Sequence, residues 1–283
     1  MCLFISSLNS GSNGNCYYVG NQNDAVLIDA GISCRETEKR MKRLGLELEK
    51  VRAIFVSHEH SDHIRGISVL AKKYQLPVYI TPNTHRNGGL AIQEHLLFSF
   101  NSFDRIRIGE LTITAFPKIH DASEPHSFVV SCQDVNVGIF TDLGAPCEQL
   151  IHHFGQCHAA FLEANYDEAM LEGGRYPYYL KRRISGGMGH LSNRQALEVF
   201  LAHRPPFMSH LLLSHLSKDN NCPDLVRELF QEHAAGTEIV VASRFEETPV
   251  FYIQPGEQSE KNLLNEEPVT IENHNGFQMS MFS

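Results

Sequence analysis

The chain carries three histidines and an aspartate, all of which can bind metal, within six consecutive positions, in the run Ser57-His58-Glu59-His60-Ser61-Asp62-His63. Imidazole nitrogens and carboxylate oxygens are common protein ligands of zinc, manganese and iron. A single histidine after a strand is often an ordinary polar residue at the start of a loop, but this density is hard to explain by structure alone. The run therefore predicts a metal site.

The elements around this run should point its side chains in two directions. Residues 51–56 are apolar and rich in β-branched side chains, which predicts a buried strand that ends before His58. Apolar residues recur at helical spacing from residue 64 to residue 74, which predicts a helix that starts at or near Asp62. In extended backbone His58 and His60 point the same way, whereas Asp62 and His63 turn away with the chain. One strand-to-helix loop could thus serve two adjacent metals.

Three later residues also follow apolar strands and are candidate partners of the first run. His120 follows residues 113–119, Asp142 follows residues 137–141, and His215 follows residues 211–214. Taken singly, each could be a polar residue that merely opens a loop. Their shared position at strand ends favours further metal ligands.

The bulk properties describe a protein without a general affinity for polyanions. The chain has 283 residues, of which 42% are hydrophobic and 20% charged, and its formal net charge is −9. Recognition of nucleic acid or of an anionic membrane would therefore have to be local. The seven cysteines have scattered spacings, which suggest neither a disulfide framework nor a thiolate zinc site and fit a reducing compartment. Since the sequence shows no signal-peptide core and no long apolar run, we expect a cytoplasmic protein with no membrane association and no obligate protein partner.

The order of elements predicts an α/β (α+β) fold with mixed sheets covered by helices. Expected strands lie at residues 3–8, 16–20, 25–29, 51–56, 78–80, 160–163, 210–213, 238–242 and 250–253, with hairpins at 105–116 and 127–140. Expected helices lie at residues 34–44, near residue 62, at 192–203 and after Pro223. Hairpins that alternate with helical crossovers favour mixed sheets. Residues 1–255 should form one domain, and the polar residues 256–283 a C-terminal tail or appendage.

The ordered set H-x-H-x-D-H, followed by a histidine, an aspartate and a histidine at strand ends, resembles the metallo-β-lactamase-fold hydrolase superfamily over roughly residues 1–255. Asp29 matches the superfamily's early strand-end aspartate, which usually supports the metal loop and is not a ligand. Within the superfamily, the details resemble the WalJ/YycJ (VicX) group most. The matching segments are residues 10–15, 120–125, 175–177, 180–184, 189–193 and 215–221.

This resemblance implies a four-layer αββα sandwich of two mixed β-sheets flanked by helices, with residues 1–255 as the catalytic domain and the site at the edge between the sheets. It also implies the ligands: His58, His60 and His120 for one metal, Asp62, His63 and His215 for the other, and Asp142 as a bridge. Ligation by nitrogen and oxygen suits zinc, manganese or iron, and a bridging carboxylate can hold two ions about 3.5–4 Å apart. We therefore expect two divalent metal ions as cofactors.

Two residues are candidates for catalysis. Two metals would activate a water for hydrolysis, and Asp62 could accept the hydrogen bond that orients this water. His190 lies just before Ser192, which opens a capping box and predicts a helix N-terminus, where free N–H groups favour phosphate. This segment is similar to the histidine motif of the superfamily's phosphodiesterases, including tRNA 3′-processing enzymes, whose histidine contacts the scissile phosphate or protonates the leaving oxygen. A histidine that merely lies beside a helix cap is the alternative.

Three segments are candidate substrate contacts. The loop that contains Ser12 and Asn13 could offer N–H and hydroxyl groups to a phosphate, although a plain hairpin turn fits its sequence equally well. Lys181 and Arg182, with tyrosines nearby, would give local positive charge and aromatic surface for a nucleic-acid strand, although a solvated charged face has the same composition. Ser192 would contact phosphate at the predicted helix N-terminus.

The WalJ/YycJ resemblance implies a nuclease, with 5′-to-3′ exonuclease activity on DNA as the best-known assignment of the group. We therefore expect a dinuclear metal-dependent phosphodiesterase that hydrolyses nucleic acid, most simply DNA. The negative net charge fits a large substrate channel poorly, and two alternatives stay open. One is a small-molecule hydrolase of the same fold that cuts a cyclic phosphodiester, a lactone or a thioester. The other is a regulatory protein tied to cell-envelope two-component signalling.

Overall fold

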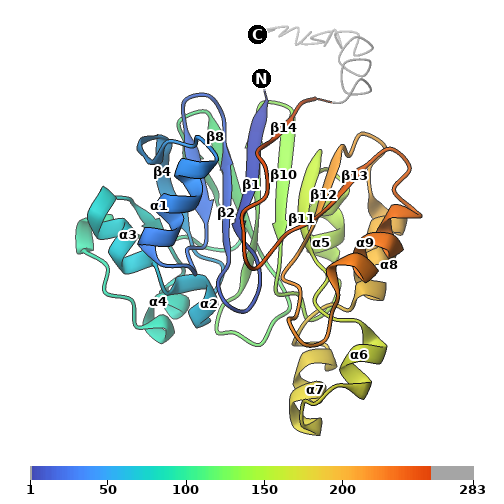
Figure 1. The fold of residues 1–283 in the computed structure, drawn as a ribbon. Coiled ribbons are helices and arrows are strands. Elements are labelled where there is room, and N and C mark those ends of the chain that lie inside the picture. The colour runs from blue at the N-terminus through green and yellow to red at the C-terminus, as the bar shows by residue number, and fades with distance from the viewer. Residues whose placement is uncertain (1, 256–283) are drawn as a thin grey trace, which may run out of the picture.

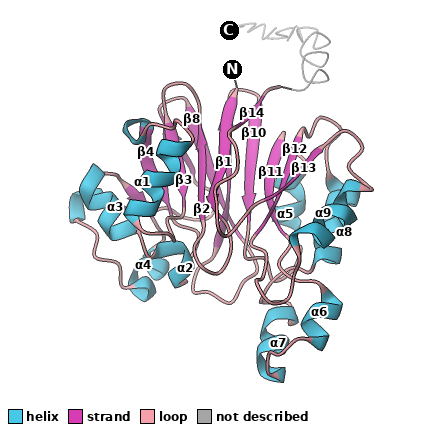
Figure 2. Cartoon of the chain, viewed as in Figure 1, coloured by secondary structure: helices cyan, strands magenta, loops and turns pink. Residues whose placement is uncertain are grey.

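The computed structural model describes residues 2–255, which form two β-sheets packed face to face between outer layers of helices (Figure 1). The same view coloured by secondary structure shows the strands at the centre and the helices on both flanks (Figure 2). This architecture confirms the expected four-layer αββα sandwich. The expected C-terminal tail, residues 256–283, lies outside the described residues.

The first sheet has the strand order β14-β1-β2-β3-β4-β5-β6. Its strands are β1 (Leu3–Asn9), β2 (Cys16–Gly20), β3 (Ala25–Ile28), β4 (Val51–Phe55), β5 (Val78–Tyr79), β6 (Leu97–Phe98) and β14 (Phe251–Ile253). The helices α1 (Cys34–Arg43), α2 (Ser61–Ile64), α3 (Ile67–Tyr74) and α4 (Pro82–Gly88) lie on its outer side, with short 3-10 helices at Leu48–Lys50 and Glu94–Leu96 (Figure 1).

The second sheet has the order β13-β12-β11-β10-β9-β8-β7. Its strands are β7 (Arg105–Ile108), β8 (Leu111–Pro117), β9 (His126–Cys132), β10 (Val135–Phe140), β11 (Ala159–Glu163), β12 (His210–Ser214) and β13 (Glu238–Val241). The helices α5 (Glu148–Phe154), α8 (Asn193–His203) and α9 (Pro223–Gln231) cover its outer face, while α6 (Glu168–Gly173) and α7 (Tyr178–Ser185) project beyond the sandwich (Figure 1). None of the helices within residues 2–255 is long and apolar enough to cross a lipid bilayer.

Aromatic side chains join the two sheets in the central core. Tyr17 of β2 packs on Phe161 of β11, with ring centroids 4.9 Å apart, and Phe55 of β4 packs on Phe128 of β9 at 5.8 Å. All four side chains are buried. Because successive residues of a strand face opposite sides, neighbouring apolar residues such as Ile54 pack instead against the outer helices. Both faces of each sheet are therefore apolar, which explains the continuous apolar runs in the sequence.

The expected strands agree with the structure to within one or two residues, but the helix expected near Asp62 is two helices, α2 and α3, separated at Gly66. Gly66 N donates to the carbonyl oxygen of Ala30 at 2.8 Å, and a Cβ on Gly66 would overlap the carbonyl oxygen of Ile32. The loop after β3 thus packs directly against the backbone of Gly66. A continuous straight helix in place of α2 and α3 would prevent this contact. Residues 178–185, for which the sequence indicates only charge, form α7.

The strand directions bring several loops to one edge of the sandwich. β3 and β4 are parallel, as are β10, β11 and β12, and β8 runs the same way as β10 because both are antiparallel to β9. Their carboxyl ends therefore lie at one edge of each sheet. His126 N, at the start of β9, donates to the carbonyl oxygen of Ser57, after β4, at 2.9 Å. This hydrogen bond joins the two sheets at that edge.

Candidate metal centre

The candidate metal centre lies where these carboxyl ends meet. β3 ends before Asp29, β4 before residues 57–63, β8 before His120, β10 before Asp142 and β12 before His215. Asp29, Asp142 and His215 have φ angles of 59°, 55° and 57°. This left-handed conformation costs a non-glycine residue on the order of 1 kcal/mol and concentrates at functional sites. At these three strand ends, the backbone therefore adopts an unfavourable conformation that places the side chain at the centre.

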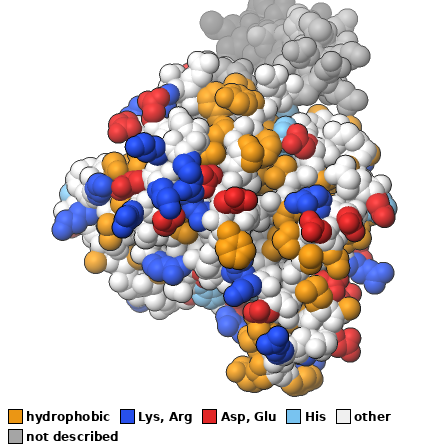
Figure 3. All heavy atoms as spheres, in the orientation of Figure 1, with side chains coloured by type: hydrophobic (Ala, Val, Ile, Leu, Met, Phe, Trp, Pro, Cys, Tyr) orange, Lys and Arg blue, Asp and Glu red, His pale blue; other side chains and the backbone are white. Residues whose placement is uncertain are grey.

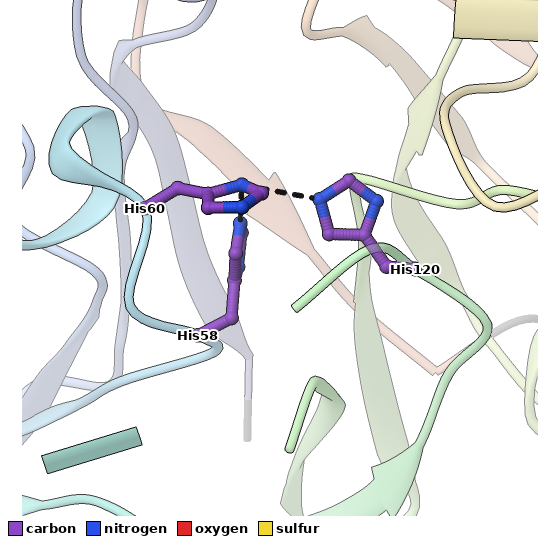
Figure 4. A group of neighbouring side chains, drawn as sticks. All are labelled: His58, His60 and His120. Carbon is purple, nitrogen blue, oxygen red and sulfur yellow. Dashed lines mark hydrogen bonds between the residues drawn. The ribbon is translucent and has the colours of Figure 1, made fainter. Parts of the chain in front are cut away.

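His58, His60 and His120 turn their ring nitrogens toward one point (Figure 4). His58 Nε2 lies 3.0 Å from His60 Nδ1, which lies 3.3 Å from His120 Nε2. The loop after β4 supplies the first two histidines, and the loop after β8, in the opposite sheet, supplies the third. As the sequence predicts, His58 and His60 face the same way.

Asp62, His63 and His215 form a second group beside the first. Asp62 Oδ2 lies 3.6 Å from His63 Nε2 and 3.5 Å from His215 Nε2. Asp142 stands between the groups, with Oδ2 3.1 Å from His63 Nε2 and Oδ1 3.9 Å from His120 Nε2. The structure thus brings all seven predicted ligands together and places Asp142 beside both triads.

Asp29 supports residues 57–63, the segment after β4 that we call the metal loop. Ser57 donates its N–H to Asp29 Oδ1 at 2.8 Å and its hydroxyl to Asp29 Oδ2 at 2.7 Å. Because that hydroxyl hydrogen is used, His58 Nδ1 donates to Ser57 Oγ, 2.8 Å away, and His58 Nε2 keeps its lone pair for the centre. His63 Nδ1 lies 2.7 Å from Asp29 Oδ2. Asp29 therefore orients two histidines and lies outside both triads.

Glu163 is a site residue that our sequence reasoning missed. It is fully buried at the end of β11, and its Oε1 accepts from His190 Nδ1 at 2.8 Å and from His215 Nδ1 at 3.0 Å. Its Oε2 accepts from the N–H groups of Leu143 at 2.6 Å and Leu191 at 3.2 Å. A carboxylate at the end of an apolar strand is the signal that indicates Asp142, and a similar signal, at the last residue of β11, could have found Glu163.

Asn15 is a second missed residue. Its Nδ2 donates to Asp62 Oδ2 at 3.1 Å and lies 3.0 Å from His63 Nε2. Its backbone N donates to the carbonyl oxygen of Asp62 at 2.7 Å, and its Oδ1 accepts from Gly11 N at 2.9 Å. The loop at residues 10–15, predicted as a substrate contact, thus also positions the metal loop.

Burial and neighbouring charges set the protonation of the centre. Burial lowers the pKa of His58 well below its ordinary value and lowers that of His120 to about 4, so both rings are neutral, as metal binding requires. Burial alone would raise the pKa of Asp62, but the charges of neighbouring histidines outweigh it and lower the pKa to about 2. The same balance holds the pKa of Asp142 well below its ordinary value.

Burial alone would lower the pKa of His63 and His215, but the neighbouring carboxylates outweigh it, so the pKa of His63 lies well above its ordinary value and that of His215 is raised to about 10. These two rings would have to release a proton to bind a metal ion, whereas His58 and His120 are already neutral.

This donor set fits divalent metal ions. His120 Nδ1 donates to the carbonyl oxygen of Gly189 at 2.9 Å, so His120 Nε2, like His58 Nε2, directs a lone pair at the centre. Asp142 is buried as well, and the neighbour of its Oδ2, His63 Nε2 at 3.1 Å, is itself a ligand candidate. Converging lone pairs beside buried carboxylate oxygens are costly unless a cation lies among them. Nitrogen and oxygen donors of this kind suit zinc, manganese or iron.

A cleft of about 380 Å³ opens over the centre. Its lining comprises Ser12, His60, Ser61, Asp62, Asp121, Asp142, Tyr176, Leu180, Arg183, Ile184, Gly189, His190 and His215. α7 therefore forms one wall, and the predicted residues Ser12 and His190 lie at the cleft surface. Arg183, next to the predicted Lys181 and Arg182, reaches the cleft and donates from Nε to Asp121 Oδ2 at 2.6 Å.

Three predicted substrate-binding residues lie outside this lining. Lys181 Nζ donates to the carbonyl oxygen of Glu172 at 2.5 Å, and Arg182 is exposed on α7. Asn13 Nδ2 donates to the carbonyl oxygen of Arg244 at 2.8 Å. These side chains flank the cleft and do not face the metal ligands.

Ser192 is also outside the lining and is completely buried. Its hydroxyl donates to Glu168 Oε1 at 3.0 Å and accepts from Gln195 N at 3.2 Å. Gln195 Oε1 in turn accepts from Ser192 N at 2.9 Å, which completes the predicted capping box of α8. The structure thus uses Ser192 as a helix cap.

The chain belongs to the β-lactamase superfamily: the family model described as "Beta-lactamase superfamily domain" matches residues 24–215. It is similar to Exodeoxyribonuclease YycJ of Bacillus anthracis, with 37% identity over 232 residues, which cover 80% of this chain and 87% of the relative. Exodeoxyribonuclease WalJ of Streptococcus pneumoniae is 29% identical over 247 residues, which cover 85% and 91%. The crystal structure of the metallo-β-lactamase fold protein YhfI from Bacillus subtilis, 17% identical, shares the fold with a TM-score of 0.69, over 89% of this chain and 100% of that one. The resemblance to the metallo-β-lactamase fold and to the WalJ/YycJ group is thereby confirmed.

Proposed function

We propose that this protein is a dinuclear metal-dependent phosphodiesterase that hydrolyses nucleic acid, and more narrowly a 5′-to-3′ DNA exonuclease. The names of the two relatives support a nuclease. The observation that carries the proposal is the position of His190, whose ring lies 5.4 Å from that of His120 and 5.1 Å from that of His215, measured between centroids. A histidine that is not in either metal triad but borders both is suited to act on a leaving group.

The two triads and Asp142 would hold the cations. Divalent cations bound there would activate water as the nucleophile and polarise the phosphodiester under attack. Asp62 has its Oδ2 between His63 and His215 and accepts a hydrogen bond from Asn15, so its carboxylate is fixed in direction. We assign Asp62 the role of orienting the attacking water as a hydrogen-bond acceptor.

His190 would protonate the leaving oxygen. Its Nδ1–H donates to the ionised Glu163, whose pKa is lowered to about 2 because His190 and His215 outweigh the effect of burial. This hydrogen bond fixes the ring so that Nε2 is the atom left to act on substrate. In the protonated ring, Nε2–H would give its proton to the departing oxygen, and Glu163 would stabilise the positive charge before transfer.

The substrate strand would enter along α7. Ser12 and Arg183 line the cleft, and Tyr178 and Tyr179 are 76% and 74% exposed on α7, where bases could stack on them. Figure 3 shows hydrophobic side chains at the tip of this projecting part, with Lys and Arg side chains just above them. Lys181 and Arg182 would attract the phosphate backbone from the flank, and we assign the buried Ser192 no substrate contact.

We also propose a cytoplasmic location. All seven cysteines lie within the described residues and are free thiols, a state that a reducing compartment maintains. Burial raises the pKa of Cys16 and Cys157 far above the ordinary value of a thiol, so neither is a reactive thiolate.

Digestion of 5′-labelled single- and double-stranded DNA and RNA in the presence of zinc, manganese or iron would test this function. We expect the wild-type protein to release labelled mononucleotides from DNA, and Asp62→Ala to lose at least about 100-fold in rate because the water-orienting carboxylate is gone. Equal rates for the wild type and Asp62→Ala on every substrate would refute the nuclease proposal. Hydrolysis of bis(p-nitrophenyl) phosphate without cleavage of any nucleic acid would instead favour a small-molecule hydrolase.

A further inference from the structure

A second pocket, of about 300 Å³, lies beside the metal cleft. The turn at residues 243–246, after β13, forms one side, and the loop after β12 with the start of α9 forms the other. We call it the Arg244 pocket, defined by Ser217, Lys218, Arg227, Arg244 and Phe245. None of these residues belongs to the metal centre or to the cleft over it.

The Arg244 pocket shares a wall with the metal centre. Ser10 lines the pocket, and its hydroxyl accepts from the backbone N–H of the metal-ligand candidate His215 at 2.7 Å. Arg244 donates from Nη2 to Asn13 Oδ1 at 3.4 Å, and the neighbouring Ser12 lines the metal cleft. A strand bound over the metals could therefore continue directly into this pocket.

The lining of the pocket has more positive than negative charge, although the net charge of the chain is −9. Lys218, Arg227 and Arg244 are its cations, Glu246 is the acidic residue of the lining, and the charge of the nearby Asp219 also acts on Arg244. Arg227 donates to Asp224 Oδ1 at 3.0 Å, whereas Arg244 Nη1 is buried and makes no hydrogen bond within the described residues. A buried guanidinium N–H without a partner is costly, and a phosphate oxygen is the acceptor that a guanidinium fits best.

An aromatic side chain is displayed beside these charges. Phe245 is 75% exposed, yet its backbone is fixed: its N–H donates to Ser243 Oγ at 3.0 Å, and its carbonyl oxygen accepts from Arg40 Nη2 at 2.9 Å. The buried Arg40 also donates from Nη1 to the carbonyl oxygen of Leu8 at 2.7 Å, which ties the turn to β1. An aromatic ring on a fixed turn next to cations is a platform for a nucleobase.

We infer that the Arg244 pocket binds a backbone phosphate of the substrate strand next to the phosphate that is cut, with an adjacent base stacked on Phe245. This inference rests on the proposed nuclease function and adds a second contact point for the strand. It also explains how a chain of negative net charge can hold nucleic acid, since the positive charge is placed where the strand passes.

The test measures binding of a 3′-fluorescein-labelled, phosphorothioate-linked DNA 12-mer by anisotropy in manganese buffer, as a function of salt. Each phosphate contact contributes about 0.7 to the slope of log affinity against log salt for a single strand, so Arg244→Gln should flatten the slope by about 0.7 and weaken binding about tenfold at low salt. Phe245→Ala should weaken binding by roughly fivefold or more without a change in slope. Arg244→Lys should keep the wild-type slope.

Arg105→Gln is the matched control, because Arg105 is exposed on β7, at the opposite edge of the sheet from β13. It should leave both affinity and slope as in the wild type. For Arg244→Gln, the loss in kcat/KM on DNA should exceed the loss on bis(p-nitrophenyl) phosphate about tenfold. A wild-type slope in Arg244→Gln, or equal losses on both substrates, would overturn the phosphate site while the nuclease stands. A wild-type protein that cuts the small diester but neither binds nor cuts nucleic acid would refute the nuclease itself.

Discussion

At the scale of single residues, Glu163 is a group outside the metal triads that contacts two of the histidines at the site. One buried carboxylate accepts four hydrogen bonds, two from histidines and two from backbone N–H groups. It thereby links His190, whose ring is proposed to protonate the leaving group, with the metal-ligand candidate His215. Such a partner fixes the tautomer and direction of both rings, so its effect on activity should exceed its effect on folding.

We predict that Glu163→Gln lowers kcat on DNA about 100-fold with little change in KM. The amide has a single acceptor oxygen, so its NH₂ group must face either the backbone N–H donors or the histidine donors. Steady-state kinetics on DNA would measure both parameters.

Glu168→Gln is a suitable control for this variant. Glu168 accepts a hydrogen bond from Ser192, two residues after His190, and this bond involves neither His190 nor His215. It should retain the wild-type kcat. A Glu163→Gln protein with the wild-type kcat, whatever its stability, would contradict the positioning role.

At the scale of elements, the break between α2 and α3 is what lets the loop after β3 reach the metal loop. Gly66 donates to the carbonyl oxygen of Ala30, and Ala30 N in turn donates to the carbonyl oxygen of His63 at 2.9 Å. These backbone contacts join the loops after β3 and β4 directly beneath the histidines. They leave no room for a side chain at position 66.

Gly66→Ala should therefore lower the free energy of unfolding by about 2–3 kcal/mol, since the new Cβ would overlap a backbone oxygen that has little freedom to shift. Urea denaturation would measure the change. Gly173→Ala, at the end of α6 where a Cβ would meet only open space, should change the stability by less than about 0.5 kcal/mol. Equal midpoints for Gly66→Ala and the wild type would show that the loop can move aside.

At the scale of the whole molecule, the centre is assembled from both sheets. The segment after β4, which comprises a loop and the helix α2, supplies four of the candidate ligands, and the loops after β8, β10 and β12 of the second sheet supply His120, Asp142 and His215. A cation bound by ligands from both sheets would hold the two sheets together. The folded state alone has these ligands together, so metal binding should stabilise it.

Removal of metal by a chelator should accordingly lower Tm, because a ligand at 100 times its Kd stabilises a fold by about 2.7 kcal/mol. Differential scanning calorimetry of chelated and manganese-reloaded protein would measure the shift. The same treatment should affect His58→Ala less, since this variant lacks one ligand of the first triad. A chelator-independent Tm in the wild-type protein would argue against resident metal.

Positive charge is placed locally on the molecule. Figure 3 shows Lys and Arg side chains gathered over the α1 side of one face, with no continuous basic band across that face. The α7 wall and the Arg244 pocket instead supply cations next to the metal cleft. This distribution reconciles a net charge of −9 with the polyanionic substrate that we propose.

The seven ligand candidates and the fold could be predicted from the sequence because their signals are local. An apolar strand followed at once by His or Asp fixes both the element and the position of the side chain at its end, and a run such as His58 to His63 needs no distant partner to be recognised. The helix break at Gly66 could not be predicted this way, since its cause is the backbone of residues 30–32.

By itself, therefore, the sequence determined which side chains are candidate metal ligands and which layers support them. Only the tertiary structure decided that Glu163 and Asn15 hold those side chains and that Ser192 is a buried helix cap. It also placed Arg244 beside the cleft, with an N–H group that has no partner within the described residues. The physical reason is that a strand end is specified by neighbouring residues, whereas a hydrogen-bond partner is specified by which distant segments pack together.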